Sequence, residues 1–120
     1  MAKVTFSKMH GTGNDFLVLD GVNHDLPSEL PVLAQKLSHR RFGVGFDQML
    51  IIRPSETADF KMEILNADGS QVEMCGNGIR CVAKYITDHE LSDKKELTIE
   101  TLGGLIRPKL IGDLVEVDMG

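Results

Sequence analysis

The sequence predicts an α+β fold in which mainly antiparallel strands accompany two helices. Many short apolar runs are separated by glycine-containing turns, which is typical of paired strands. Two other segments have apolar residues at helical spacing. The 120 residues, 42% hydrophobic and 26% charged, are sufficient for one folded domain with a core of moderate size.

The N-terminal third is expected to form two strands and a helix. Residues 4–9 and 16–20 are predicted strands, and residues 11–14 turn between them. A helix is expected over residues 26–41, with Ser28 as the N-cap and a proline tolerated only because it falls in the first turn. The apolar stripe of this helix consists of Leu30, Leu33, Ala34 and Leu37.

The middle of the chain is expected to pair strands. Residues 43–45 end the helix, and residues 48–53 form a strongly apolar strand. Residues 60–66 alternate between apolar and polar types, which predicts a half-buried strand. Asp68-Gly69 is a hairpin turn signal before a short strand over residues 72–74.

A second helix is predicted after Cys75, because four apolar residues recur there at helical spacing. These are Ile79, Val82, Ala83 and Ile86. The remaining residues are expected to form strands over 97–101, 105–110 and 114–119, joined by turns at Gly103-Gly104 and Gly112-Asp113.

Charge and targeting signals exclude several function classes. The formal net charge is -5 with both signs interspersed, so a nucleic-acid partner is not expected. The only dense basic run, His39-Arg40-Arg41, is interpreted as the solvated end of a helix. Neither a membrane-spanning run of about 18 apolar residues nor an N-terminal signal-peptide region is present, so no membrane association and a cytoplasmic location are expected.

The cysteines and histidines indicate neither a disulfide framework nor a metal site. Two cysteines six positions apart are expected to remain thiols in a reducing compartment. The four histidines are scattered, and none forms a compact pair with a cysteine, so no metal is expected.

Cys75 is the strongest candidate for a chemical role. It stands where a strand gives way to Gly76-Asn77-Gly78 and a helix begins. Amide N–H groups at a helix start have no intrahelical partners, and the dipole there favours a thiolate or a bound carboxylate. A buried, inert thiol is the alternative interpretation of the same pattern.

Cys81 has a different interpretation. On a helix, a separation of six residues corresponds to a rotation of about 600° and a rise of about 9 Å. The two sulfur atoms would therefore point in directions about 120° apart and could not face each other across one carbon atom. Apolar neighbours favour core packing for Cys81.

The other polar signals are each compatible with a purely structural role. Residues 11–15 are either a phosphate-binding loop lacking the P-loop lysine or a tight hairpin turn. Residues 45–48 are also explained as the end of a loop, Asn66 as a turn residue and Asn77 as a helix cap. His10 receives no role.

Four motifs together resemble one family. They are Lys8-Met9-His10-Gly11-Thr12-Gly13-Asn14-Asp15-Phe16, Gly43-Val44-Gly45-Phe46-Asp47-Gln48, residues 60–70 ending in Asn66-Ala67-Asp68-Gly69-Ser70, and Cys75-Gly76-Asn77-Gly78-Ile79-Arg80-Cys81. In this order they are similar to the signatures of diaminopimelate epimerases.

The resemblance implies a fold of two pseudo-symmetric lobes, each with strands around a central helix and with substrate between them. It implies interconversion of LL- and meso-diaminopimelate, for lysine and cell-wall synthesis, without pyridoxal phosphate or another cofactor. Cys75 matches one of two catalytic thiols. Asn14, Gln48, Asn66, Gly76 and Asn77 match substrate-binding positions.

The chain departs from the family in length, because residues 1–120 correspond to the N-terminal lobe alone. The C-terminal lobe, which would supply the second thiol, is expected to be the missing partner, and the isolated chain is expected to be inactive. A homodimer is expected for the full-length enzyme. A proline-racemase-type enzyme and a non-catalytic binding module are the alternatives.

Overall fold

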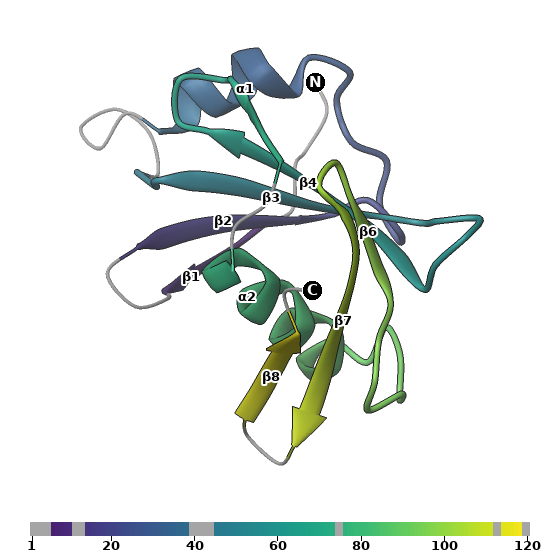
Figure 1. Cartoon of the computed structure of the whole chain (residues 1–120). Coiled ribbons are helices and arrows are strands. Elements are labelled where there is room, and N and C mark those ends of the chain that lie inside the picture. The colour runs from purple at the N-terminus through teal and green to yellow at the C-terminus, as the bar shows by residue number, and fades with distance from the viewer. Residues whose placement is uncertain (1–5, 11–13, 39–44, 74–75, 112–113, 119–120) are drawn as a thin grey trace.

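The computed structural model of the chain describes residues 6–10, 14–38, 45–73, 76–111 and 114–118. Within these ranges the chain forms an eight-stranded sheet and two helices (Figure 1). The elements are β1 (Phe6–His10), β2 (Asp15–Asp20), α1 (Leu30–Leu37), β3 (Gln48–Arg53), β4 (Phe60–Asn66), β5 (Gln71–Val72), α2 (Gly76–Asp88), β6 (Ile99–Thr101), β7 (Gly104–Ile111) and β8 (Leu114–Asp118).

The sheet is mixed and curls around α2 (Figure 1). Its strand order is β1-β2-β3-β4-β6-β7-β8, and β5 pairs with β4 beside this path. Most described pairs are antiparallel, as predicted, but β2 with β3 and β4 with β6 are parallel. Parallel neighbours need a long crossover connection, and α1 and α2 lie within these two crossovers.

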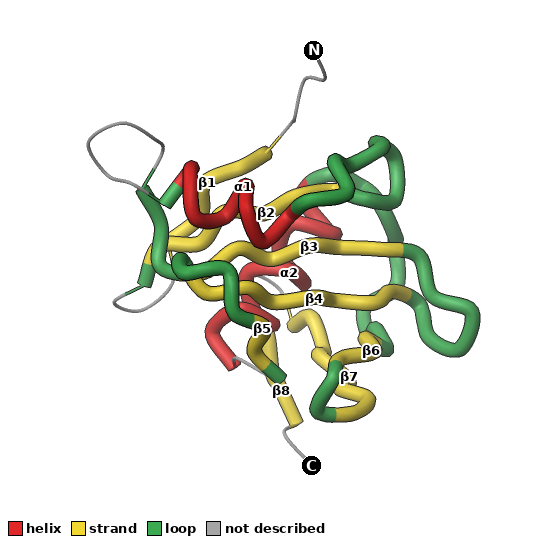
Figure 2. The backbone as a smooth tube through the Cα atoms, turned by 90° about the horizontal axis from the view of Figure 1, so that it is seen from above, coloured by secondary structure: helices red, strands yellow, loops and turns green. Residues whose placement is uncertain are grey.

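The two helices cover opposite faces of the sheet (Figure 2). On β2, Phe16 and Val18 face the α2 side, whereas Leu17 and Leu19 face the α1 side. Strand β3 alternates in the same way, so both strands are buried on both faces. This double burial explains why their sequences are continuous apolar runs rather than alternating ones.

Strand β4 has one fully apolar face, as its alternating sequence predicts. Phe60, Met62 and Ile64 are buried on the α2 side, whereas Lys61 and Glu63 are only partly covered. The predicted bounds of β3 and β4 match the structure at both ends. The Asp68-Gly69 hairpin is also confirmed: Gly69 has a φ of 89°, and its N–H donates to the Asn66 carbonyl over 2.9 Å.

Helix α1 differs from the prediction at its start. It begins at Leu30 with Glu29 as the N-cap residue, and no side chain caps it, so the Ser28 assignment is wrong. Ser28 lies outside the helix because the first helical hydrogen bond runs from the Leu33 N–H to the Glu29 carbonyl. Pro31 does lie in the first turn, as expected. Leu30 and Ala34 of the apolar stripe are buried, and Leu33 and Leu37 pack beside them.

Helix α2 provides the larger core. Its four predicted stripe residues are fully buried, and Cys81 is 6% exposed among them, which confirms the core assignment for this thiol. The three C-terminal strands are also present, although β6 begins two residues later than predicted. Among the described residues, no helix is long and apolar enough to cross a bilayer.

Several sequence-based predictions fall on undescribed positions. The turns at residues 11–13 and 112–113 and Cys75 itself lie outside the described ranges. The predicted helix end at Arg41 is wrong, because α1 ends at Leu37 and its last hydrogen bond runs from the N–H of the C-cap residue Ser38 to the Ala34 carbonyl.

Candidate functional site

Three of the predicted site residues meet at one edge of the sheet. Asn14 directly precedes β2, Gln48 begins β3, and Asn66 ends β4. The strand register pairs Phe16 with Gln48 and Gln48 with Asn66, so the three amide residues come from adjacent strands. Adjacent strands lie about 4.8 Å apart, which brings residues distant in sequence within reach of one ligand.

The side chains of Gln48 and Asn66 lie on the face of the sheet that α2 covers. Side chains alternate along a strand, and Leu50 on β3 and Ile64 on β4 belong to the α2-side core. Gln48 and Asn66, two positions away from these residues, therefore continue the same rows. The buried apolar face thus ends in a polar edge.

Hydrogen bonds join the amides of this edge into a chain. Gln48 Nε2 donates to Asn66 Oδ1 over 3.1 Å, and Asn66 Nδ2 donates to Ser70 Oγ over 3.1 Å. Ser70 Oγ donates in turn to Asp68 Oδ1 over 2.6 Å. The sequence interpretation included Asp68 as a turn residue and gave Ser70 no role; the turn signal located the loop but not its contact with Asn66.

The length of the connection limits how far the start of helix α2 can lie from this edge. Val72 of β5 pairs with Ile64 of β4, and α2 begins at Gly76, four residues later. Four residues span at most about 14 Å, so the helix start stays within that distance of Val72. Asn77 in the first turn is half-buried, and this turn contains no acidic residue. The backbone N–H groups of this turn are suited to bind an anion.

Cys75 directly precedes α2, as predicted. Its own position lies outside the described residues, so the burial and orientation of its thiol stay a prediction. The helix start beside it is described, and this is the feature that would stabilise a thiolate.

A second set of contacts, which the sequence did not reveal, joins the starts of β2 and β3. The Asp15 N–H donates to Asp47 Oδ2 over 2.7 Å, and the Asp47 N–H donates to the Asp15 carbonyl over 2.9 Å. His10 Nδ1 lies 2.6 Å from Asp15 Oδ1. These reciprocal bonds hold the residue after Asn14 against the residue before Gln48, and so position both amides.

The chemistry of this edge is that of neutral amides beside a helix start. Amide side chains offer both donors and acceptors and can contact both the ammonium and the carboxylate of an amino acid. Within the described part of the chain, no three His, Cys, Asp or Glu side chains are grouped so that they could hold a metal ion.

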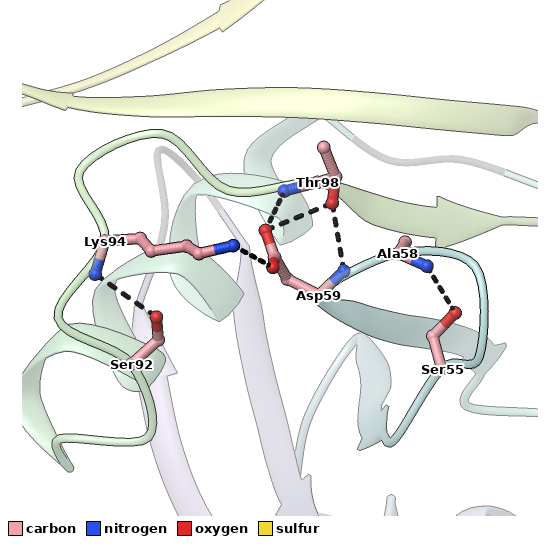
Figure 3. A network of polar contacts seen from close by, with 6 residues as sticks. All are labelled: Ser55, Ala58, Asp59, Ser92, Lys94 and Thr98. Carbon is pink, nitrogen blue, oxygen red and sulfur yellow. Dashed lines mark hydrogen bonds and ion pairs between the residues drawn. The ribbon is translucent and has the colours of Figure 1, made fainter.

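A carboxylate with a lowered pKa lies elsewhere, at the opposite end of β4 (Figure 3). Asp59 accepts from Lys94 Nζ over 2.6 Å and from the Thr98 N–H over 2.9 Å. The hydrogen bond from Lys94 is the main reason that the pKa of Asp59 lies below its ordinary value; burial opposes it, and the Thr98 bonds support it. This cluster ties the start of β4 to the start of β6, and we assign it a structural role.

The fold is shared with an amino-acid epimerase of known structure. The crystal structure of a hydroxyproline epimerase from Agrobacterium vitis superposes with a TM-score of 0.67 at 18% sequence identity, over 89% of this chain and 37% of that chain. The curled sheet around a central helix therefore places the chain in this fold class.

The sequence comparisons identify the family within that class. A family model described as diaminopimelate epimerase matches residues 6–120. The chain belongs to the diaminopimelate epimerase family.

Curated relatives agree with this assignment. The diaminopimelate epimerase of Carboxydothermus hydrogenoformans is 52% identical over 118 residues, and that of Moorella thermoacetica is 49% identical over 120 residues. Both alignments cover 96% of this chain but 43% of the relative. The chain therefore spans less than half the length of the curated relatives it matches.

Proposed function

We propose that this chain is the N-terminal lobe of a two-lobe enzyme that interconverts LL- and meso-2,6-diaminopimelate by proton transfer at the α-carbon. The observation that carries the proposal is the family match over residues 6–120, which contains a helix starting directly after Cys75. The polar edge formed by the matched amides supports it.

In the proposed reaction, Cys75 acts as the base on one face of the substrate. The helix start favours its thiolate, which takes the α-proton: a C–H bond breaks, an S–H bond forms, and the electron pair stays on the α-carbon. Fixed backbone dipoles beside the reacting centre stabilise the developing negative charge.

A second thiol must then donate its proton to the opposite face of the same carbon atom, which inverts the configuration. Cys81 cannot do this, because it is 6% exposed within the α2-side core. The second thiol is therefore assigned to the C-terminal lobe, and residues 1–120 alone are expected to be inactive.

The substrate contacts follow from the residues that match the family. Gly76 and Asn77, at the α2 start, would hold the carboxylate and ammonium at the reacting centre. Asn14, Gln48 and Asn66 would contact the remainder of the substrate. This scheme requires neither pyridoxal phosphate nor a metal.

The cellular setting is part of the proposal. The full enzyme would be a cytoplasmic homodimer that serves lysine and peptidoglycan precursor synthesis, with no nucleic-acid or membrane partner. Measuring the mass of the native protein in solution tests the dimer.

Deuterium exchange from solvent into the α-position of diaminopimelate tests the chemistry. In the full two-lobe protein, Cys75→Ala should reduce exchange by roughly 10²–10⁴-fold, the usual contribution of a general base. Exchange that survives this change would remove the thiol from the reaction. Turnover by residues 1–120 alone would contradict the need for a second lobe.

The two alternatives are separated by different measurements. A proline-racemase-type activity would appear as exchange into proline or hydroxyproline but not diaminopimelate; the likeness to hydroxyproline epimerase concerns the fold alone. For a non-catalytic binding module, pH-dependent alkylation of Cys75 should give the pKa of an ordinary cysteine, about 8.5, whereas the proposed base should titrate lower.

A further inference from the structure

We infer that Ser70, oriented by Asp68, is a positioning residue that determines which atoms of Asn66 and Gln48 face the substrate. The inference rests on the proposed function and adds to it two residues outside the set of expected substrate contacts. It concerns the hydrogen-bond chain that runs from the β4–β5 turn to the start of β3.

The hydrogen-bond chain begins at the Asp68 carboxylate, which can only accept hydrogen bonds. Asp68 Oδ1 lies 2.6 Å from Ser70 Oγ and 2.9 Å from the Ser70 backbone nitrogen. The bond from the Ser70 hydroxyl is the largest cause lowering the pKa of Asp68, and the Ser70 backbone N–H lowers it further. An ionised carboxylate has no proton to donate, so the single hydroxyl proton of Ser70 points to Asp68.

That direction fixes the next two side chains. With its proton committed to Asp68, Ser70 Oγ can only accept, so the Asn66 group facing it over 3.1 Å is the NH₂ group. Asn66 Oδ1 then faces Gln48 and accepts from Gln48 Nε2 over 3.1 Å. Neither amide can rotate by 180° without placing two donors or two acceptors against each other.

The consequence for a ligand is a defined pattern of donors and acceptors. Each amide NH₂ group carries two protons, and the chain uses one from Asn66 and one from Gln48. No hydrogen bond within the described ranges uses the second proton of either group or Gln48 Oε1, so these atoms can serve a ligand at the edge. A preset pattern lowers the cost of ordering these side chains when substrate binds.

Helix α1 holds in place the β4–β5 turn, which carries the first residue of the hydrogen-bond chain, Asp68. Gln35 Nε2 donates to the Asp68 carbonyl over 2.6 Å, and Ser38 Oγ donates to the Ala67 carbonyl over 3.1 Å. The turn is therefore anchored from the opposite face of the sheet, and its hydroxyl has a fixed place relative to β4.

Steady-state kinetics of the full two-lobe protein with diaminopimelate test the inference. Ser70→Ala should raise KM about fivefold, the effect of one neutral hydrogen bond, with kcat within twofold. Ser70→Thr, which keeps the hydroxyl, should restore KM.

Ser55→Ala is the matched control. Ser55 Oγ also lies in a turn beside β4 and donates to a carboxylate, Glu100 Oε1, over 2.9 Å, but at the other end of the strand. Its removal should leave KM unchanged. An unchanged KM in Ser70→Ala, an equal rise in Ser55→Ala, or no rescue by Ser70→Thr would overturn the inference.

Side-chain amide NMR of the same protein separates this inference from the proposed reaction, because it needs no substrate or turnover. The NH₂ protons of Asn66 should show a nuclear Overhauser effect to the Ser70 β-protons, and those of Gln48 should not. Asn66 protons that contact Gln48 instead would overturn the orientation even in an active enzyme. Absent epimerase activity with the expected NMR contacts would refute the reaction and leave the orientation standing.

Discussion

The two ends of β4 carry different kinds of polar contact: a charged pair at its start and neutral amides at its end. At its start, Asp59 forms an ion pair with Lys94 and two hydrogen bonds with Thr98, and the pKa of its carboxyl is lowered. At its end, Asn66 joins a chain of neutral groups to Gln48 and Ser70. Phe60 and Asn66, the two ends of β4, are about 20 Å apart, because six steps of about 3.4 Å separate them.

The difference teaches that a perturbed pKa does not by itself locate a reaction site. Asp59 stabilises a strand junction, and ion pairs of this kind perturb pKa values without any catalytic role. The amides have no charge to titrate, yet they are the residues that match the family's substrate-binding positions. Three substitutions test this division, from the largest expected effect to the smallest, and a fourth prediction concerns a polar group on α2.

Breaking the turn at the amide end should have the largest effect. At Gly69, with φ of 89°, an added Cβ would lie 2.8 Å from the Pro31 carbonyl oxygen. Gly69→Ala should lower the free energy of unfolding by about 3 kcal/mol, from backbone strain together with steric overlap. Urea denaturation followed by circular dichroism measures this.

Gly104→Ala is the control for Gly69→Ala. Gly104 also has a positive φ, of 121°, but an added Cβ would meet nothing within 4 Å. Strain alone should cost about 1–2 kcal/mol there. Equal losses in the two variants would show that the contact with α1 does not matter.

Removing an amide should affect activity and leave stability nearly intact. Asn66→Ala in the full protein should reduce kcat/KM for diaminopimelate by about 10–100-fold, since one ligand contact and the orientation of Gln48 are lost together. The free energy of unfolding should change by less than about 1 kcal/mol, because Asn66 is only half-buried. A large loss of stability with little loss of activity would reverse the division between the two ends.

Removing Asp59 should lower stability and leave activity nearly intact. Asp59→Ala should lower the free energy of unfolding at pH 7 by about 1–2 kcal/mol, discounted because Lys94 is largely exposed, and leave kcat/KM within twofold. The folded pKa is below the model-peptide value of 3.8. The contribution is therefore complete above pH 3.8 and is lost as the pH falls through the folded pKa.

The pH dependence gives this prediction a second measurement. The stability difference between wild type and Asp59→Ala should shrink when urea denaturation is repeated below pH 3. Asp93→Asn is the control, because Asp93 is exposed and lies in the same loop as Lys94. Its free energy of unfolding should equal that of the wild type at every pH. If the stability difference between wild type and Asp59→Ala grew as the pH falls, the ion pair between Asp59 and Lys94 would be contradicted.

The smallest effect concerns a third polar group, Tyr85 on α2, which is the only tyrosine in a chain without tryptophan. Burial raises its pKa above 10.0, the charge of Asp20 raises it further, and a hydrogen bond with Ser7 lowers it. Absorbance titration should therefore give a midpoint above 10. Ser7→Ala should raise the midpoint and Asp20→Asn should lower it; shifts in the same direction would show that this environment is wrongly assigned.

Much of the fold could be predicted because it depends on local periodicity. The alternation of residues 60–66 and the apolar run of residues 48–53 gave both ends of β4 and β3. The helical stripe of α2 gave the core that buries Cys81. The four motifs gave the family, since spacing along the chain is information that the sequence holds completely.

The sequence by itself thus determined the elements, the family and the candidate thiol. Only the tertiary structure decided that β2 and β3 are parallel, that Asn14, Gln48 and Asn66 meet at one edge, and that Ser70 orients the amides. It also placed the N-cap of α1 at Glu29 rather than at Ser28. These features depend on which strands become neighbours, and that choice is made by burying two apolar faces at once rather than by any local pattern.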